Sequence, residues 1–250
     1  MNAIFYYIIL ILSGLIVGSF LNVAIYRIPL NKSIALPSSF CPACSHKLRF
    51  YDNIPLISYL FLKGRCRDCK SRISSRYPIV EALTSFLFAV GYYFKGLSFN
   101  LMLSLILICV LVIVSFTDIE HGIIPNVIVL PFTVIGLIIN IILVPQKWWI
   151  ILSFTAGAFL FMLIISLVYP KGMGMGDVKL SLMAGSFLVE NIIPGLFIGF
   201  LAGSVYGIIM LIIKKKKLGQ TIPFGPFVSG GCIIALFFGT RIINWYLGFI

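Results

Sequence analysis

Two aspartates in an otherwise apolar chain are the first residues whose types and positions could do chemistry. Asp118 lies in the segment FTDIEHGIIPN, residues 116–126, and Asp177 lies in GMGMGDVKL, residues 172–180. Two facing carboxyl groups can share one proton, so that one donates a hydrogen bond to a carbonyl oxygen while the other takes a proton from an attacking water. The pair therefore predicts acid–base hydrolysis at a carbonyl group.

The residues around Asp177 suggest how a substrate would reach it. We expect Gly174 and Gly176 to allow close backbone approach and unusual dihedral angles, which leaves room for an extended substrate beside the carboxylate. We expect Lys179 either to orient a carboxylate or to anchor its helix among lipid headgroups. In the competing interpretation Asp118 is a solvated residue at a helix end, Asp177 caps a helix N-terminus, and the glycines only let helices pack closely.

Four cysteines form a second candidate site. They occur as the pairs CPAC (Cys41, Cys44) and CRDC (Cys66, Cys69), with 21 residues between the pairs. This pattern is typical of a zinc ribbon, in which each pair supplies two thiolates to one tetrahedral ion. Four protein ligands leave no open position for a substrate, so we predict a structural zinc. Two disulfides are the alternative, which a reducing cytosolic location disfavours.

The composition identifies the class of protein that must position these groups. Apolar residues make up 60% of the chain and charged residues only 10%, with a mean hydropathy of +1.11. Soluble domains carry about 25% charged residues, so we predict an all-α polytopic membrane protein. The net charge of +12 is explained by basic cytoplasmic loops and not by nucleic acid, which we do not expect as a partner.

Hydropathy predicts about eight transmembrane helices, because each crossing needs about 20 apolar residues. The stretch 179–213 is too long for one crossing and is interrupted by Glu190, Asn191 and Pro194, so we interpret it as a hairpin of two spans. The loop 28–78 is the only sizeable polar piece and carries the four cysteines. The expected spans are residues 4–26, 79–95, 99–117, 124–144, 149–169, 179–191, 193–213 and 226–248.

The distribution of Lys and Arg predicts the orientation of these spans. If the N-terminus lies outside, only Lys95, Lys147 and Arg241 face the outside, and the other sixteen basic residues face the cytoplasm. The sixteen include Lys171 and the run Lys214–Lys217. This asymmetry follows the rule that cytoplasmic loops collect positive charge. In this orientation Asp118 follows the third span and Asp177 precedes the sixth, so both lie at the cytoplasmic boundary.

An ordered set of short segments resembles the bacterial type IV prepilin peptidases. The segments cover nearly the whole chain and occur in the order found in that family. They are GSFLNVAIYRIP (18–29), CPAC (41–44), DNIPLISYLFLKGRCRDC (52–69), SRYPIVE (75–81), DIEHGIIPN (118–126), GMGDVKL (174–180) and IPFGPF (222–227).

The resemblance implies an intramembrane aspartic endopeptidase of the bacterial inner membrane that is also an N-methyltransferase. Its substrates are prepilins and pseudopilins, whose short basic leader is cut off after a glycine at the cytoplasmic face. By the same resemblance, Asp118 and Asp177 are the catalytic residues. The new N-terminal residue is then methylated with S-adenosylmethionine as the methyl donor.

The resemblance also implies a division of labour along the chain. Residues 1–95, with the cysteine loop, would form the N-terminal prepilin peptidase domain associated with methylation, and residues 96–250 would form the peptidase domain. Glu81 falls in the segment resembling the family's PxVE motif. We expect it to bind the new amine of the substrate or the methyl donor, or else to complement a helix dipole.

Two functions of other classes fit the same residues. A proton-coupled transporter would use intramembrane carboxylates as proton relays, although it would place them nearer the midplane of the bilayer. A non-catalytic assembly scaffold would dock through the cysteine loop and tolerate loss of both aspartates.

Overall fold

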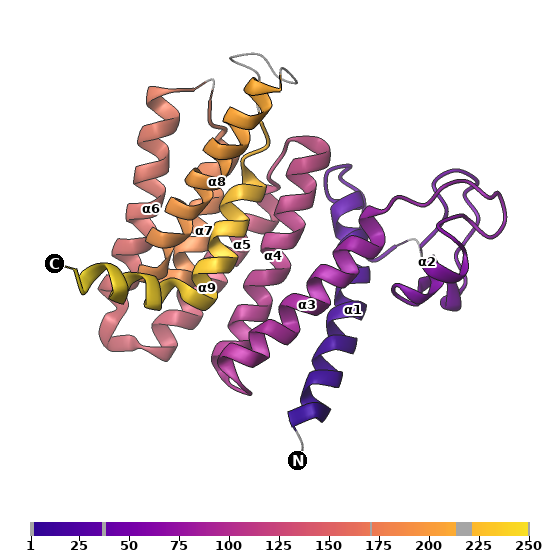
Figure 1. The fold of residues 1–250 in the computed structure, drawn as a ribbon, viewed down its shortest axis with the longest axis horizontal. Coiled ribbons are helices and arrows are strands. Elements are labelled where there is room, and N and C mark those ends of the chain that lie inside the picture. Colours follow the sequence, from indigo (N-terminus) through magenta and orange to yellow (C-terminus); the bar gives the residue numbers. More distant parts are fainter. Residues whose placement is uncertain (1–2, 37–38, 171, 214–221, 250) are drawn as a thin grey trace. The chain divides into compact units, whose positions relative to one another are not determined.

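The computed structural model describes residues 3–36, 39–170, 172–213 and 222–249, and helices joined by loops make up its regular structure (Figure 1). Within these ranges there are two isolated β-bridges and no β-strand, which confirms the all-α prediction. Lys171 and the lysine run 214–217, on which the predicted orientation partly depends, lie outside the described residues. The elements are α1 (Ala3–Arg27), η1 (Phe50–Asn53), α2 (Ile57–Phe61), α3 (Arg76–Lys95), α4 (Phe99–His121), α5 (Asn126–Leu143), η2 (Pro145–Lys147), α6 (Trp148–Val168), α7 (Met175–Leu188), η3 (Val189–Asn191), α8 (Ile192–Ile212) and α9 (Gly225–Leu247).

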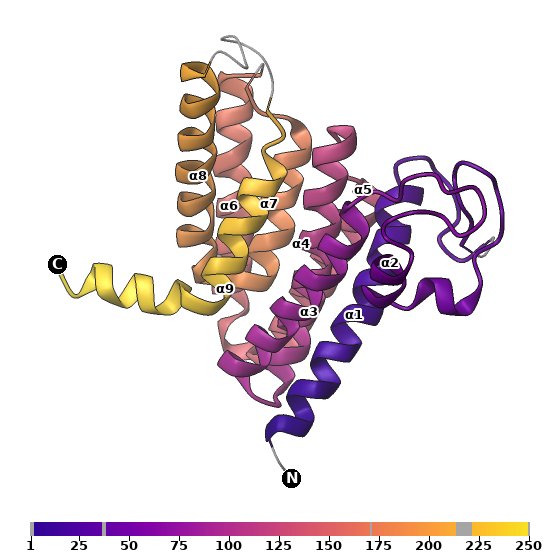
Figure 2. The ribbon, with the colours of Figure 1, turned by 45° about the vertical axis from the view of Figure 1, so that its right-hand side comes forward.

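Among the described residues, seven segments are long and apolar enough to cross a membrane. One of them, Met175–Ile212, is 38 residues long and is not a single helix. It consists of α7 and α8, which are joined by η3 and run in opposite directions (Figures 1 and 2). The hairpin predicted for residues 179–213 is therefore present, and it explains why hydropathy indicated about eight spans. The protein is a multi-pass membrane protein.

Two helix boundaries near the aspartates differ from the predicted ones. α4 continues to His121, four residues beyond the predicted end, and α7 begins at Met175, four residues before the predicted start. Hydropathy predicts which residues lie in lipid and not where a helix ends, because a helix can continue into polar residues for as long as its hydrogen-bond pattern does. For α4 that end is Gly122, whose positive φ of 65° and N–H bond to the Asp118 carbonyl close the helix. Asp118 and Asp177 therefore lie inside the terminal turns of their helices.

The chain divides into two compact units, Met1–Ile113 and Val114–Ile250. In the first unit α1 and α3 pack against each other in antiparallel fashion. A Cβ atom on Gly14 would lie 2.6 Å from the Ser85 Cα, and one on Gly18 would lie 2.7 Å from the Glu81 Cα. Only glycine permits backbones to approach this closely, which is the usual means of packing helices in a membrane.

In the second unit the short helix α7 is enclosed by α5, α6 and α9. Fourteen residues span about 21 Å, less than the roughly 30 Å of a hydrocarbon layer, and nine of the fourteen residues are buried. The α5 contact is tight, because a Cβ on Gly136 would collide with Ser186. Asn140 of α5 also donates a hydrogen bond to the Ser186 carbonyl at 2.8 Å. The segment that carries Asp177 is thus fixed by neighbours on several sides.

Candidate active site and metal centre

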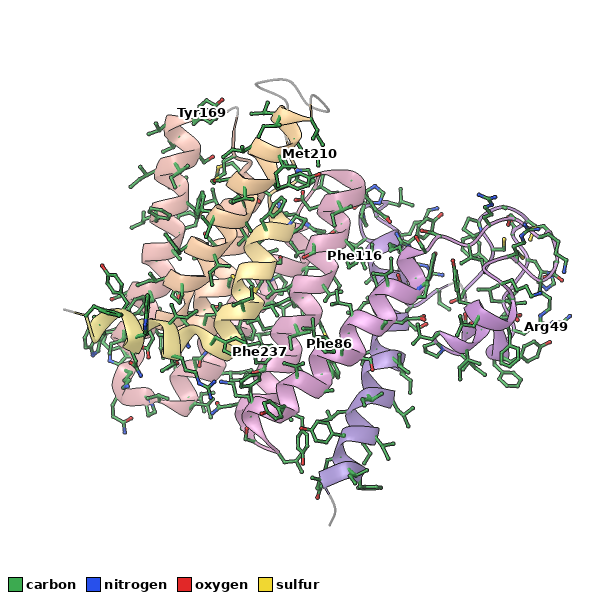
Figure 3. The ribbon with its side chains drawn as sticks, in the orientation of Figure 1. Arg49, Phe86, Phe116, Tyr169, Met210 and Phe237 are labelled. Atoms are coloured by element: carbon green, nitrogen blue, oxygen red, sulfur yellow. The ribbon has the colours of Figure 1, made fainter. Side chains whose placement is uncertain are left out.

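Asp118 is held in the last turn of α4 by the first residue of α9. Its carboxylate Oδ2 accepts a hydrogen bond of 2.9 Å from the backbone N–H of Gly225, and the residue is only 7% exposed. A Cβ on Gly225 would lie 2.9 Å from the same oxygen, so a side chain at this position would displace the carboxylate. Phe116, labelled in Figure 3, marks the turn of α4 that precedes Asp118.

Asp177 lies in the first turn of α7 and is also 7% exposed. Its carboxylate interacts with the backbone N–H of Gly174, the residue that precedes α7. The alternative interpretation of Asp177 as the residue that caps the helix is wrong, because the N-cap is Gly174 and Asp177 is the third residue of α7. One oxygen of the carboxylate, Oδ1, is buried and has no hydrogen-bond partner among the described residues. Oδ1 is thus the part of the Asp177 carboxylate that the contact with Gly174 does not use.

The two aspartates, 59 residues apart in the sequence, are close enough for their charges to interact. Two contacts bring the start of α7 against the segment that follows α4. A Cβ on Gly176 would lie 3.0 Å from the Ile124 Cβ, and Lys179 Nζ donates a hydrogen bond of 3.1 Å to Asn126 Oδ1. Two buried carboxyl groups in one site can share a proton, which is the arrangement that activates water in aspartic proteases.

The glycines before Asp177 behave differently from one another. Gly176 is needed for the close approach to Ile124, as expected. The expectation of unusual dihedral angles is wrong, since neither Gly174 nor Gly176 has a positive φ. Gly174 adopts an extended conformation with φ −80°, and a Cβ there would meet nothing closer than 3.7 Å. Its contribution in this structure is its backbone N–H.

Sequence reasoning missed the role of Gly225. The segment IPFGPF was recognised only as a resemblance, because a glycine far from both aspartates carries no functional group that suggests chemistry. Lys179 was expected to orient a carboxylate or to anchor its helix among lipid headgroups, and in this structure its Nζ donates a hydrogen bond to Asn126 at the start of α5. This bond links the start of α5 to α7, the helix that carries Asp177.

The four cysteines converge as the pattern predicted. Their sulfur atoms all lie within 4.8 Å of one another, and none of the cysteines is in a disulfide. The two pairs are built alike: the residue after each pair, Ser45 or Lys70, has a φ of 59° and donates its N–H to the first cysteine's carbonyl. Cys41 Sγ and Cys69 Sγ are 3.8 Å apart, which matches the spacing of about 3.8 Å for tetrahedral zinc–sulfur bonds of about 2.3 Å.

The electrostatics of the cluster favour a cation. Burial raises the pKa of Cys41, but hydrogen bonds from the backbone of Cys44 and Ala43 and from Ser71 outweigh it and lower that pKa to about 6. The His46 backbone favours the Cys44 thiolate, yet desolvation and the neighbouring sulfurs of Cys41 and Cys69 raise the pKa of Cys44 to about 12. A cation placed between these sulfurs would offset the repulsion that disfavours the Cys44 thiolate. The cluster therefore fits a metal with soft ligands.

Glu81 is bonded within its own unit, Met1–Ile113. It is buried in the second turn of α3, so the interpretation as a charge at the helix N-terminus is wrong. Its Oε2 accepts a hydrogen bond of 2.8 Å from the Leu56 backbone N–H, and the Ser19 side chain also bonds to the carboxylate. Glu81 thereby joins the insertion between α1 and α3 to both helices.

Comparison with known proteins identifies the family. The model of the Bacterial Peptidase A24 N-terminal domain matches residues 12–94, and that of the Type IV leader peptidase family matches residues 105–212. Proteins named prepilin leader peptidase/N-methyltransferase are similar over nearly their whole length. The one from Bacillus subtilis is 37% identical (96% of this chain, 97% of the relative), and the one from Legionella pneumophila is 36% identical (98% and 96%). No match to a solved structure was found. The chain, with its pair of buried aspartates, belongs to the type IV leader peptidase family.

Proposed function

We propose that this protein removes the leader peptide from type IV prepilins and pseudopilins and methylates the new N-terminal residue. The observation that carries the proposal is the pair of buried, interacting carboxylates of Asp118 and Asp177. It occurs in a chain whose full length is similar to proteins named prepilin leader peptidase/N-methyltransferase. Transport and scaffolding, the alternatives weighed from sequence, are not favoured by this family membership.

The carboxylate pair supplies the chemistry of peptide hydrolysis. The ionised member takes a proton from water while the water oxygen attacks the scissile carbonyl carbon, and the protonated member donates a hydrogen bond to the carbonyl oxygen. The tetrahedral intermediate then collapses, the C–N bond breaks, and the leaving nitrogen receives a proton from the pair. The products are the leader carboxylate and the new N-terminal amine. Because the two groups titrate as a unit, we assign the roles to the pair.

We propose that cleavage takes place after a glycine at the cytoplasmic face, with the N-terminus of the enzyme outside. The asymmetry of sixteen basic residues against three supports this orientation. The position of both aspartates in terminal helix turns supports chemistry at a membrane boundary. A prepilin with a basic leader and an apolar helix would present its scissile bond at that same boundary.

We propose that methylation depends on the N-terminal part, residues 1–95, and that hydrolysis belongs to residues 96–250. The names of the relatives imply S-adenosylmethionine as the methyl donor. The described residues do not show a site that fits it. A cavity of about 400 Å³ in the insertion is lined by Phe61, Leu62, Lys63, Arg65, Cys66 and Lys70. Its three positive charges are a poor match for a sulfonium. Glu81 is already bonded to Leu56.

The cysteine cluster is proposed to hold a structural zinc ion. Cys41, Cys44, Cys66 and Cys69 would be its ligands, and the ion would fix the fold of an insertion whose described part has only η1 and α2 as helices. With all four positions filled by protein, the ion would not contact a substrate.

Substitution of Cys41 by Ser tests the metal site. We expect purified wild-type enzyme to contain about one zinc per chain and the Cys41→Ser variant to lose it, as measured by inductively coupled plasma mass spectrometry. The insertion should then become sensitive to limited proteolysis. Cys109→Ser, at a cysteine in α4 away from the cluster, is the matched control and should retain zinc. A folded wild-type sample that contains no zinc would contradict the assignment.

The function itself is tested with purified enzyme and a prepilin. We expect incubation without methyl donor to give a product shortened by its leader, and incubation with S-adenosylmethionine to add 14 Da, one methyl group in place of one hydrogen, to the new N-terminus. Intact-mass spectrometry measures both changes in one spectrum. A precursor that remains uncut, or is cut elsewhere than after the leader glycine, would refute the proposal.

A further inference from the structure

The insertion between α1 and α3 carries a cluster of exposed apolar side chains that the proposed chemistry does not use. Phe50 and Phe61 are each 84% exposed and Leu60 is 72% exposed. Ile54 and Ile57 add to the same stretch, at 40% and 52%. We call residues 50–61 the apolar segment. Large apolar side chains gathered at a protein surface mark a contact with another protein or with a membrane.

A hydrogen bond fixes the depth of this segment relative to the spanning helices. The Leu56 N–H, at the start of α2, donates to Glu81 Oε2 at 2.8 Å. Glu81 is five residues past the beginning of α3, a distance of about 7.5 Å along the helix at 1.5 Å per residue. The start of α2 therefore lies beside the second turn of a membrane-spanning helix, and not beyond its end. Both views of the fold show α2 alongside the upper turns of α1 and α3 (Figures 1 and 2).

The apolar surface of α2 also continues a surface that faces lipid. α3 exposes Ile79 at 52%, two residues before the Glu81 that holds α2. α1 exposes Phe20 at 52%, next to the Ser19 that bonds the same carboxylate. These side chains belong to helices that cross the bilayer, so the medium around them at this depth is lipid. A segment bonded to Glu81 lies next to that medium.

The charges that flank the apolar segment indicate which lipids it meets. Residues 28–75 contain eight Lys and Arg residues and two Asp residues. One of the aspartates, Asp52, is already paired with Arg67 at 2.9 Å. Arg49 lies just before the segment, at the outer edge of the insertion in Figure 3, and Lys63 and Arg65 follow it directly. Basic residues beside exposed apolar ones are typical of segments that bind the interface of an anionic membrane.

We propose that the apolar segment, residues 50–61, docks into the headgroup–acyl boundary of the lipid bilayer on the face where the insertion emerges. Phe50, Leu60 and Phe61 enter the boundary, and the flanking basic residues bind anionic phospholipid headgroups. Glu81 is the positioning residue that sets the depth of α2 through the Leu56 N–H. The insertion is thereby held against the membrane and does not move freely above it.

The proposal is tested in full-length enzyme reconstituted in nanodiscs that contain phosphatidylglycerol. A photoreactive benzoylphenylalanine replaces Phe61, an aromatic and exposed position where the exchange leaves the fold intact. The control position is Ala43, which is exposed in the first cysteine pair. After irradiation, mass spectrometry identifies what is covalently attached. We expect phospholipid adducts at position 61 in at least about fivefold excess over position 43.

Each other outcome overturns the proposal. Adducts at position 61 mainly to an added prepilin would identify a substrate-binding surface, and adducts to another enzyme chain would identify a dimer interface. Equal lipid adducts at both positions would mean that the segment is not docked. A second measurement does not depend on cross-linking: cleavage of the insertion by trypsin should be at least about tenfold slower in phosphatidylglycerol than in phosphatidylcholine nanodiscs, and Phe50→Ser with Phe61→Ser should abolish the difference. Retention of the difference in that double variant would contradict docking through these side chains.

Discussion

Asp177→Asn is expected to abolish leader cleavage while the protein stays folded and inserted. Asparagine has nearly the shape of aspartate but can neither ionise nor pass on a proton, so one of the two carboxyl groups that must exchange the proton during hydrolysis is lost. Loss of acid–base catalysis of this kind reduces rates by about 10²–10⁴-fold. Because the two carboxylates act as a unit, Asp118→Asn should have a similar effect. The measurement is the rate at which purified enzyme converts a prepilin, followed by gel shift or intact mass.

The control removes a carboxylate from the same helical hairpin. Glu190, an exposed residue of η3, follows the other end of α7. Glu190→Gln makes the same chemical change as Asp177→Asn and should leave cleavage within about twofold of wild type, as surface substitutions generally do. Size-exclusion profiles and thermal midpoints in detergent show whether the variants are folded. Folded Asp177→Asn protein that cleaves at the wild-type rate would exclude the aspartate pair as the catalytic group.

Gly231→Val is expected to disrupt the packing of α8 against α9. It should also reduce prepilin cleavage, although position 231 is not one of the two aspartates. A Cβ at position 231 would collide with the Gly195 carbonyl oxygen and lie 2.6 Å from the Gly199 nitrogen, so α9 must shift. Overpacking of this kind costs about 1–3 kcal/mol of folding free energy. α9 also begins with Gly225, which bonds Asp118. A shift of about 1 Å at a catalytic group can slow a reaction by about 10²-fold.

The neighbouring glycine supplies the matched control. A Cβ on Gly230 would meet no described atom within 4 Å, so Gly230→Val introduces the same side chain into the same helix without the collision. Thermal midpoints and prepilin cleavage are measured for both variants. We expect Gly230→Val to resemble the wild type. If the two variants have equal midpoints and equal activity, the close contact between α8 and α9 is not what positions Gly225.

The sequence was sufficient for the layout of the membrane helices but not for their ends. Apolar runs predicted each span and the reversal at Glu190–Pro194, because lipid immersion is recorded directly in hydropathy. The same signal ends at Phe116 and Thr117, although α4 continues to His121. Polar residues can extend a helix beyond the hydrocarbon, and only the left-handed Gly122 marks the stop.

The sequence also predicted only part of each candidate site. Cysteine spacing predicted the convergence of four sulfurs, since each Cys-x-x-Cys turn is local and its geometry follows from few residues. The carboxylates were recognisable by type and by their expected depth. Their partners were not, because Gly225 and Leu56 contribute backbone N–H groups. Every residue except proline carries such a group, so no residue type reports which one is used.

The bond between Asp118 and Gly225 has a consequence for biosynthesis. It joins residues 107 positions apart, and the donor is the first residue of α9, the last helix among the described residues. While the ribosome is still making α9, Asp118 lacks the backbone donor that orients it. Asp118 can therefore acquire this donor only after α9 has been made and has packed against α4.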